Sequence, residues 1–200
     1  DFYRKIKPNV HALVLPSERM KKNIADSWKG KTYIIPEPVE IDFIKPGNRQ
    51  LKESTALWFG HITNLGWMLE YMRSGLHQAP PKHLIILVNN HPEAAVKEAA
   101  KQAPKGMKIS LAKWSVKTMI QAAKISHYVL IPSNKDDPRK SGVSPGRLLT
   151  SLAMGLPVVA SPLDSYMPFK EFFSIIGTEE GLRTMKNPLD QNDKILKAQE

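Results

Sequence analysis

Short apolar runs of strand length alternate with helix-like patterns along most of the chain. Within one helix-like stretch the apolar residues recur at i, i+3, i+4 and i+7, which is the spacing of a helix with one buried face; these are Leu65, Met68, Leu69 and Met72. Further helices are predicted after Ser17, Pro92, Ser115 and Ser144, with Thr63 or Asn64 capping the helix of Leu65, and short helices over 165–200. The strand-like runs cover 11–16, 32–36, 55–59, 83–88, 107–111, 127–132 and 156–160.

This alternation predicts βαβ units and a parallel sheet. Residues 83–88 are almost continuously apolar, as expected of a strand covered on both faces. We therefore predict an α/β fold, a Rossmann-like parallel sheet with helices on both faces. Ligands of such sheets bind beyond the carboxyl ends of the strands. The positions of interest therefore follow Phe59, Val88, Leu111, Pro132 and Ala160.

Residues 133–161 form a polar loop, a helix and a buried strand, and the start of this helix has the features of an anion site. Ser144 is a suitable N-cap, Pro145 suits the first helical position, and Gly146 leaves the helix start uncovered. The exposed N–H groups and the helix dipole attract anions, and Lys140 and Arg147 flank them. The pattern fits a diphosphate site, and it also fits an ordinary capped helix with solvated basic neighbours.

Two glycines complete this segment. Gly142 would allow close approach of the backbone to a ligand, and Gly155 suits the left-handed cap that ends a helix. Residues 36–54 are instead rich in proline, glycine and polar residues, which predicts a hinge or linker. The chain begins without methionine and in the middle of a pattern, so we expect it to be a fragment or a processed product.

The formal net charge of +10 favours anionic partners, namely phosphates, nucleic acid or an acidic membrane surface. The lysines are scattered along the chain, so a solvated basic surface also explains them. The chain has no arginine-rich arm and no RNA-binding aromatic motif, which disfavours nucleic acid. It has no cysteine, which excludes disulfides, zinc-thiolate sites and a thiol nucleophile and is compatible with a reducing compartment. No apolar run reaches the length of about 18 residues that a membrane span needs.

Several kinds of chemistry lack support. The six histidines show no paired spacing with carboxylates, so we expect no metal site. Asp136 and Asp137 precede a proline in a loop, where a flexible turn explains them better than a metal does. The dinucleotide-binding G-x-G-x-x-G, the P-loop and the serine nucleophile elbow are absent.

Residues 147–161, RLLTSLAMGLPVVAS, resemble the helix-Gly-Leu-Pro-strand segment of glycosyltransferases with the GT-B architecture, in the glycosyl transferases group 1 class. Three more segments resemble this family in the same order, and together they cover about residues 9 to 175. These segments are 11–40, 57–65 and 113–133.

The resemblance implies the C-terminal half of a GT-B fold, which binds a nucleotide-diphosphate sugar for transfer to an unknown acceptor. It implies that residues 1–40 end an N-terminal domain and cross over, that 41–175 form the donor-binding domain and that 176–200 form C-terminal helices. It also implies metal-independent transfer without a cofactor, with the nucleotide sugar and a missing N-terminal acceptor domain as partners. We expect this chain alone to be inactive, and we expect a cytoplasmic protein whose charge allows peripheral contact with an anionic membrane.

The resemblance assigns donor-binding roles and no catalytic residue. Gly60, His61 and Thr63 would face the phosphates or the sugar of the donor. Lys113 and Trp114 would contact the base, and Thr150 would contact the ribose. The nest that binds the anion would comprise Lys140, Ser141, Gly142, Val143, Ser144 and Arg147. Each role has a structural alternative, since a tryptophan after a strand also suits a core, His61 also suits a helix cap and Arg147 also suits a surface ion pair.

The sequence departs from the family at two acidic positions. Many members carry a pair of glutamates eight residues apart, and Gly142 and Thr150 stand there in this chain. The family's Arg and Lys of the first loop are also missing, and His61, Thr63 and Asn64 take that space. Two other functions therefore stay open: a non-catalytic binding or scaffold domain with the same fold, and a basic nucleic-acid or membrane-surface module.

Overall fold

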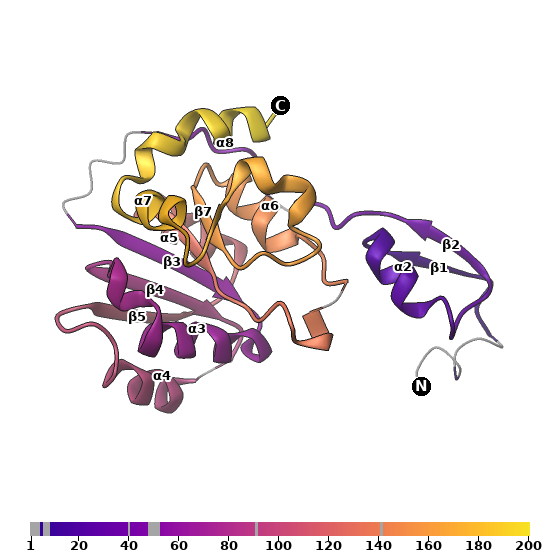
Figure 1. Ribbon diagram of the computed structural model, residues 1–200, viewed down its shortest axis with the longest axis horizontal. Coiled ribbons are helices and arrows are strands. Elements are labelled where there is room, and N and C mark those ends of the chain that lie inside the picture. Colours follow the sequence, from indigo (N-terminus) through magenta and orange to yellow (C-terminus); the bar gives the residue numbers. More distant parts are fainter. Residues whose placement is uncertain (1–4, 6–8, 40, 48–52, 91, 141) are drawn as a thin grey trace.

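The computed structural model describes residues 5, 9–39, 41–47, 53–90, 92–140 and 142–200 of the 200-residue chain (Figure 1). They form a small lobe and a larger α/β body, joined by a crossover that follows β2 (Figure 1).

The small lobe consists of β1 (Ala12–Leu15), α2 (Glu18–Ile24) and β2 (Lys31–Ile34), and the two strands pair in parallel. Ser17 caps α2, because its Oγ accepts a hydrogen bond from the Met20 N–H at 3.1 Å. Trp28 is buried against Leu15 and Ile24 and forms the centre of this lobe. The sequence predicts a helix that follows Ser17 and runs to about Trp28, but α2 ends at Ile24, because the chain turns there to bring Trp28 into the lobe.

The body contains six parallel strands in the spatial order β5-β4-β3-β6-β7-β8. Their bounds are β3 (Thr55–Gly60), β4 (His83–Val88), β5 (Lys108–Lys113), β6 (Tyr128–Ile131), β7 (Val158–Ala160) and β8 (Ser174–Ile175). The order reverses between β3 and β6, which is the arrangement of a doubly wound Rossmann-like sheet. The predicted fold class is thus confirmed.

Helices cover both faces of this sheet. α3 (Ile62–Ser74) and α4 (Glu93–Ala100) pack on one face, where β3 contributes Ala56 and Trp58. α5 (Val116–Lys124), α6 (Gly146–Ala153) and α8 (Asn192–Ala198) pack on the other, where β3 contributes Leu57 and Phe59. The alternation of side chains along a strand thus produces two cores, one on each side of the sheet.

The C-terminal part contains α7 (Glu179–Lys186) and the 3₁₀ turns η4 (Met167–Phe172) and η5 (Pro188–Gln191). Two further 3₁₀ turns, η2 (Leu76–Gln78) and η3 (Pro138–Lys140), lie earlier in the chain. β8 was not predicted, because two residues are too few to show a period in the sequence.

The crossover is attached to the far end of α6. The Ile44 N–H donates to the Ala153 carbonyl at 2.7 Å. The Gln199 side chain, just after α8, donates to the carbonyls of Ile44 at 3.0 Å and Leu152 at 2.8 Å. The crossover, the end of α6 and the end of α8 therefore meet at one point.

Candidate functional site

A cleft of about 570 Å³ opens at the carboxyl edge of the sheet, at the point where the strand order reverses. This is where a doubly wound sheet binds its ligands. The lining residues come from the crossover, the ends of β3, β4 and β5, the helices α3, α5 and α6, and the loops after β6 and β7. They are Glu37, Pro38, Phe59, Gly60, His61, Asn64, Asn89, Trp114, Met119, Lys140, Val143, Ser144, Gly146, Arg147, Thr150, Leu163 and Tyr166.

Strand register sets one edge of the cleft. Gly60, Val88 and Lys113 end β3, β4 and β5 at the same level of the sheet. The residues that follow them are His61, Asn89 and Trp114, and all three line the cleft. The chain therefore presents a row of ring and amide side chains along this edge.

The start of α6 forms the opposite wall. The Ser144 Oγ accepts from the Gly146 N–H at 3.1 Å, but Ser144 is not the N-cap that the sequence predicts. The helix begins at Gly146, one residue later than predicted, and Pro145 stands at the cap position. Gly155 ends this segment with φ +67°, which is the predicted left-handed conformation.

Arg147 is the main cation of the cleft. Its Nη1 atom is buried and has no hydrogen-bond partner among the residues that the structure describes. A Cβ at Gly60 would lie 3.4 Å from this nitrogen, so the guanidinium reaches across to the end of β3. A buried guanidinium nitrogen without a hydrogen-bond partner is costly in free energy. Such a group points to an anionic ligand, and the alternative of a surface ion pair is wrong.

Tyr166 borders the same space. Its side chain is buried, and its ring contacts Phe173 edge to face at 6.1 Å. Burial raises the pKa of Tyr166, and the charge and hydrogen bonding of Arg147 offset part of this rise. Tyr166 therefore stays protonated and can act as a hydrogen-bond donor at neutral pH.

Lys140 supplies the second cation, and its ammonium group donates to Asn64 Oδ1. This contact joins the loop after β6 to the first turn of α3. The side chain of Asn89 accepts from the Ile62 N–H at 2.9 Å and so supports the same helix start. The Lys140 side chain thus holds the Asn64 amide, and the Ile62 N–H holds the Asn89 amide.

His61 both caps a helix and lines the cleft. Its Nδ1 caps α3 by accepting from the Thr63 N–H at 3.3 Å. The helix therefore starts before Thr63 and Asn64, and the prediction that one of these caps it is wrong. An imidazole nitrogen takes the place that a serine or aspartate oxygen more commonly fills.

Of the two residues predicted to contact the base, only Trp114 lines the cleft. Trp114 lines the cleft and is 37% exposed, so the core alternative is wrong for this residue. Lys113 is exposed at the end of β5, and Thr63 is exposed on α3. Neither lines the cleft. Thr150 does line it, one helical turn beyond Arg147.

The predicted nest of 141–144 is divided. Val143 and Ser144 line the cleft, whereas Gly142 is buried against α2. The Gly142 carbonyl accepts from the Ser17 hydroxyl at 3.4 Å, and a Cβ at Gly142 would come within 3.2 Å of the Met20 backbone. Its φ of +83° and this packing explain the glycine without a ligand. Ser141 lies outside the described residues.

Several lining residues were missed by sequence reasoning. Glu37 and Pro38 belong to the segment that was assigned to a linker, and proximity to α6 could not be inferred from composition. Asn89 directly follows a predicted strand, which was the available signal. Phe59, Met119, Leu163 and Tyr166 also line the cleft, and their apolar or aromatic side chains gave no sequence signal of a binding role.

The structure also bears on other chemistry. Across the described ranges, no group of three or more His, Asp or Glu side chains could hold a metal ion. Asp136 lies in a turn, where its N–H donates to Asn134 Oδ1 at 2.9 Å. In the same part of the chain, no helix has both the length and the apolar character that crossing a membrane requires.

Comparison with known proteins gives a match for the fold. No family model matches the chain, and no curated protein does. Among solved structures, TarM from S. aureus, in a complex that includes UDP, has a TM-score of 0.70 at 10% identity over 98% of this chain and 41% of its own. HepE from Anabaena, in complex with UDP and glucose, has a TM-score of 0.68 at 12% identity, and the match covers 97% of this chain and 58% of HepE. The lipopolysaccharide outer core galactosyltransferase WaaB has a TM-score of 0.60 at 14% identity, and the match covers 94% of this chain and 57% of WaaB.

These matches identify the fold of the chain. The fold is that of the glycosyltransferases with two Rossmann-like domains, known as GT-B. The chain spans 41% to 58% of the length of these three proteins, and it has the fold of the C-terminal half.

Proposed function

We propose that this chain is the donor-binding half of a glycosyltransferase and that its cleft binds a nucleotide-diphosphate sugar. The observation that carries the proposal is Arg147, whose buried Nη1 has no partner within the described part of the chain and borders the cleft. The UDP in the complexes of TarM and HepE, which share the fold, supports the same ligand class.

The diphosphate would bind between the start of α6 and the two cations. Gly146 has no side chain to cover the first turn, and the helix dipole favours negative charge there. Arg147 can approach two phosphate oxygens at once, while Lys140 contributes a point charge. These groups would stabilise the charge that develops on the leaving phosphate when the glycosidic bond breaks.

The nucleoside would extend along the sheet edge. Trp114 offers a partly exposed indole face on which a base could pack. Thr150 lines the cleft on the next turn of α6 and could donate to or accept from a ribose hydroxyl. Lys113 and Thr63, which lie outside the cleft, have no part in this arrangement.

We also propose that transfer requires a second domain that holds the acceptor, and that it proceeds without a metal. The cations at the start of α6 would take the charge-neutralising role that a metal has in other transferases. In the absence of the acceptor domain, the chain would bind the donor and transfer nothing.

Arg147→Gln tests the proposal. We expect the variant to bind UDP more weakly by a factor on the order of ten to one hundred, the range for loss of a charged hydrogen bond. Its thermal stability should stay close to that of wild type, because Arg147 is only partly buried and its Nη1 has no hydrogen-bond partner among the described residues. Isothermal titration calorimetry and thermal unfolding measure the two effects.

Arg183→Gln is the matched control, because Arg183 is exposed on α7 and pairs with Glu179 at 3.7 Å. It should leave UDP binding unchanged. If the wild-type chain binds none of UDP, GDP and ADP at millimolar concentration, the donor-binding proposal fails and the scaffold alternative gains support.

A further inference from the structure

Glu37 brings a negative charge from the crossover into the cleft. It is the one acidic side chain among the cleft-lining residues of the described ranges, and the charged groups opposite are Lys140 and Arg147. An ionised carboxylate accepts hydrogen bonds and donates none. The cleft thus contains an acceptor of a kind that a diphosphate does not need.

The absence of a side chain at Gly146 makes room for this carboxylate. A Cβ at Gly146 would lie 2.5 Å from Glu37 Oε2 and 3.6 Å from Glu37 Cδ. The first distance is shorter than any normal contact, so even an alanine at this position would displace the carboxylate. The location beside the first turn of α6 also favours a negative charge, because the helix dipole is positive there.

Two neighbouring donors, the Gly146 N–H and Arg147 Nη1, do not hydrogen-bond to the Glu37 carboxylate. The Gly146 N–H donates to Ser144 Oγ rather than to Glu37. Within the described set of residues, Arg147 Nη1 has no hydrogen-bond partner, so Glu37 does not satisfy it. A cation and a carboxylate therefore border one cavity and leave capacity for a ligand that suits both.

A nucleotide sugar has the matching chemistry. Its diphosphate suits the cations, and its sugar hydroxyls can donate to a carboxylate. A nucleoside diphosphate instead ends in phosphate oxygens, which a nearby carboxylate repels. We infer that Glu37 accepts hydrogen bonds from hydroxyls of the donor sugar and so makes the cleft discriminate in favour of the sugar-bearing nucleotide. This inference rests on the proposed function.

The test compares two ligands on matched variants. Wild type is first titrated by calorimetry with UDP-glucose, UDP-N-acetylglucosamine, GDP-mannose and ADP-glucose, and the tightest binder is then compared with its own nucleoside diphosphate. We expect Glu37→Gln to weaken binding of the nucleotide sugar about five- to tenfold, the difference between a charged and a neutral acceptor. Binding of the nucleoside diphosphate should stay the same or tighten.

Asp42→Asn is the control, since it makes the same chemical change at an exposed crossover position outside the cleft. It should alter neither affinity. Gly146→Ala gives a second route, because it displaces the Glu37 carboxylate while leaving its charge in place. It should also reduce the affinity for the nucleotide sugar relative to that for the nucleoside diphosphate. Thermal unfolding checks that each variant is folded.

The outcomes separate the inference from the proposed function. A selective loss for the nucleotide sugar supports the role of Glu37. Equal tightening of both ligands would show that Glu37 is only a competing anion, and no change in either would show that it does not contact the ligand; both results overturn the inference alone. Failure of wild type to bind any of the nucleotides overturns the proposed function and the inference together.

Discussion

Arg147 and Gly60 are 87 positions apart in the sequence, yet the space beside one is filled by the other. A Cβ at Gly60 would lie 3.4 Å from Arg147 Nη1, which is ordinary contact, and a longer side chain would press on the guanidinium. The end of β3 therefore limits where the cation can be. This restriction suits a group that must be in place before its ligand arrives.

His83 gives a pH-dependent contribution to stability away from the cleft. Its Nε2 lies 2.8 Å from Ser110 Oγ, and its pKa is lowered by partial burial and by the charge of Lys108. Between this lowered pKa and the ordinary value of about 6.5, the unfolded chain binds more protons than the folded one. The free energy of unfolding should therefore fall as the pH falls through that window and be fully restored above it.

The expected change is small, because the side chain is only partly buried. Urea unfolding at pH 7.5 and pH 5.5 measures it in wild type and in His83→Gln. The variant should lose less stability on acidification than wild type does. An equal or larger loss in the variant would contradict this account.

The roles of single residues were predictable from the sequence to different degrees. Gly155 was predicted as a left-handed cap, because it directly follows the apolar stripe of a helix, and its φ is +67°. Gly142 was predicted to let the backbone approach a ligand, whereas its packing against α2 explains why a glycine is present. Glu37 carried no local signal at all, since its importance depends on a contact with a residue 109 positions away.

At the scale of elements, α6 contacts other parts of the molecule at both of its ends. Its first turn borders the cleft, and its last turn holds the crossover through Ile44 and the C-terminal helix through Gln199. At Gly155 the backbone carbonyl of Ile44 would lie 2.3 Å from a Cβ. This contact is with backbone, so it cannot be relieved by a side-chain rotation.

Gly155→Ala should therefore destabilise the protein in two ways. A left-handed conformation costs an alanine about 1 to 2 kcal/mol, and the contact with Ile44 adds to this. Gly106→Ala is the control, because its φ is +82° and nothing lies within 4 Å of the added Cβ. Urea unfolding should show the larger loss for Gly155→Ala. Equal losses would mean that the crossover yields easily.

Elements were predicted well where burial imposes a pattern. Residues 83–88 are buried along almost their whole length and match the predicted strand. Element ends were less predictable, since they depend on capping chemistry such as the His61 imidazole at α3. The two-residue β8 was missed because its position comes from pairing with β7.

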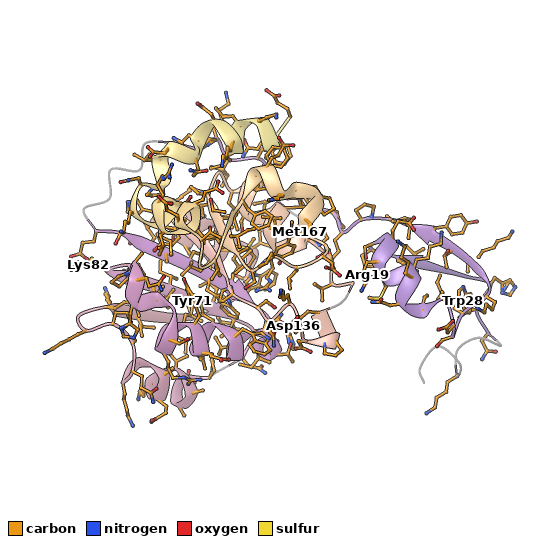
Figure 2. The ribbon with its side chains drawn as sticks, viewed as in Figure 1. Arg19, Trp28, Tyr71, Lys82, Asp136 and Met167 are labelled. Atoms are coloured by element: carbon orange, nitrogen blue, oxygen red, sulfur yellow. The ribbon has the colours of Figure 1, made fainter. Side chains whose placement is uncertain are left out.

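On the scale of the whole molecule, the small lobe contacts the body through α2 and the residue that caps it. Figure 2 shows Arg19 on the side of α2 that faces the body and Trp28 within the lobe. Arg19 pairs with Asp164 at 3.5 Å, but both side chains are about half exposed or more, so the pair adds little stability. The parallel order of the sheet was predictable from alternation, whereas this placement of the lobe was not.

The small lobe also has one exposed apolar face. Val14 and Tyr33 are paired in register, Ile35 follows on the same side, and these side chains are 61%, 55% and 58% exposed. Neighbouring exposed apolar groups of this kind promote association. The opposite face of the two strands is buried on Trp28 and so has no part in this surface.

The double variant Val14→Thr with Tyr33→Thr should bind less of the dye ANS and scatter less light at high protein concentration. Threonine preserves strand propensity, so folding should be retained. Val116→Thr is the control, because Val116 is an exposed valine on α5, outside this face. A similar decrease in the control would show that the effect does not belong to the exposed face of the lobe.

The crossover meets α6 at both of its ends. Glu37 lies against Gly146 at the first residue of the helix, and Ile44 is hydrogen-bonded to Ala153 at its last. The segment that connects the small lobe to the body therefore also borders the first turn of α6. A ligand that binds at this turn would touch the connection between the two parts of the molecule.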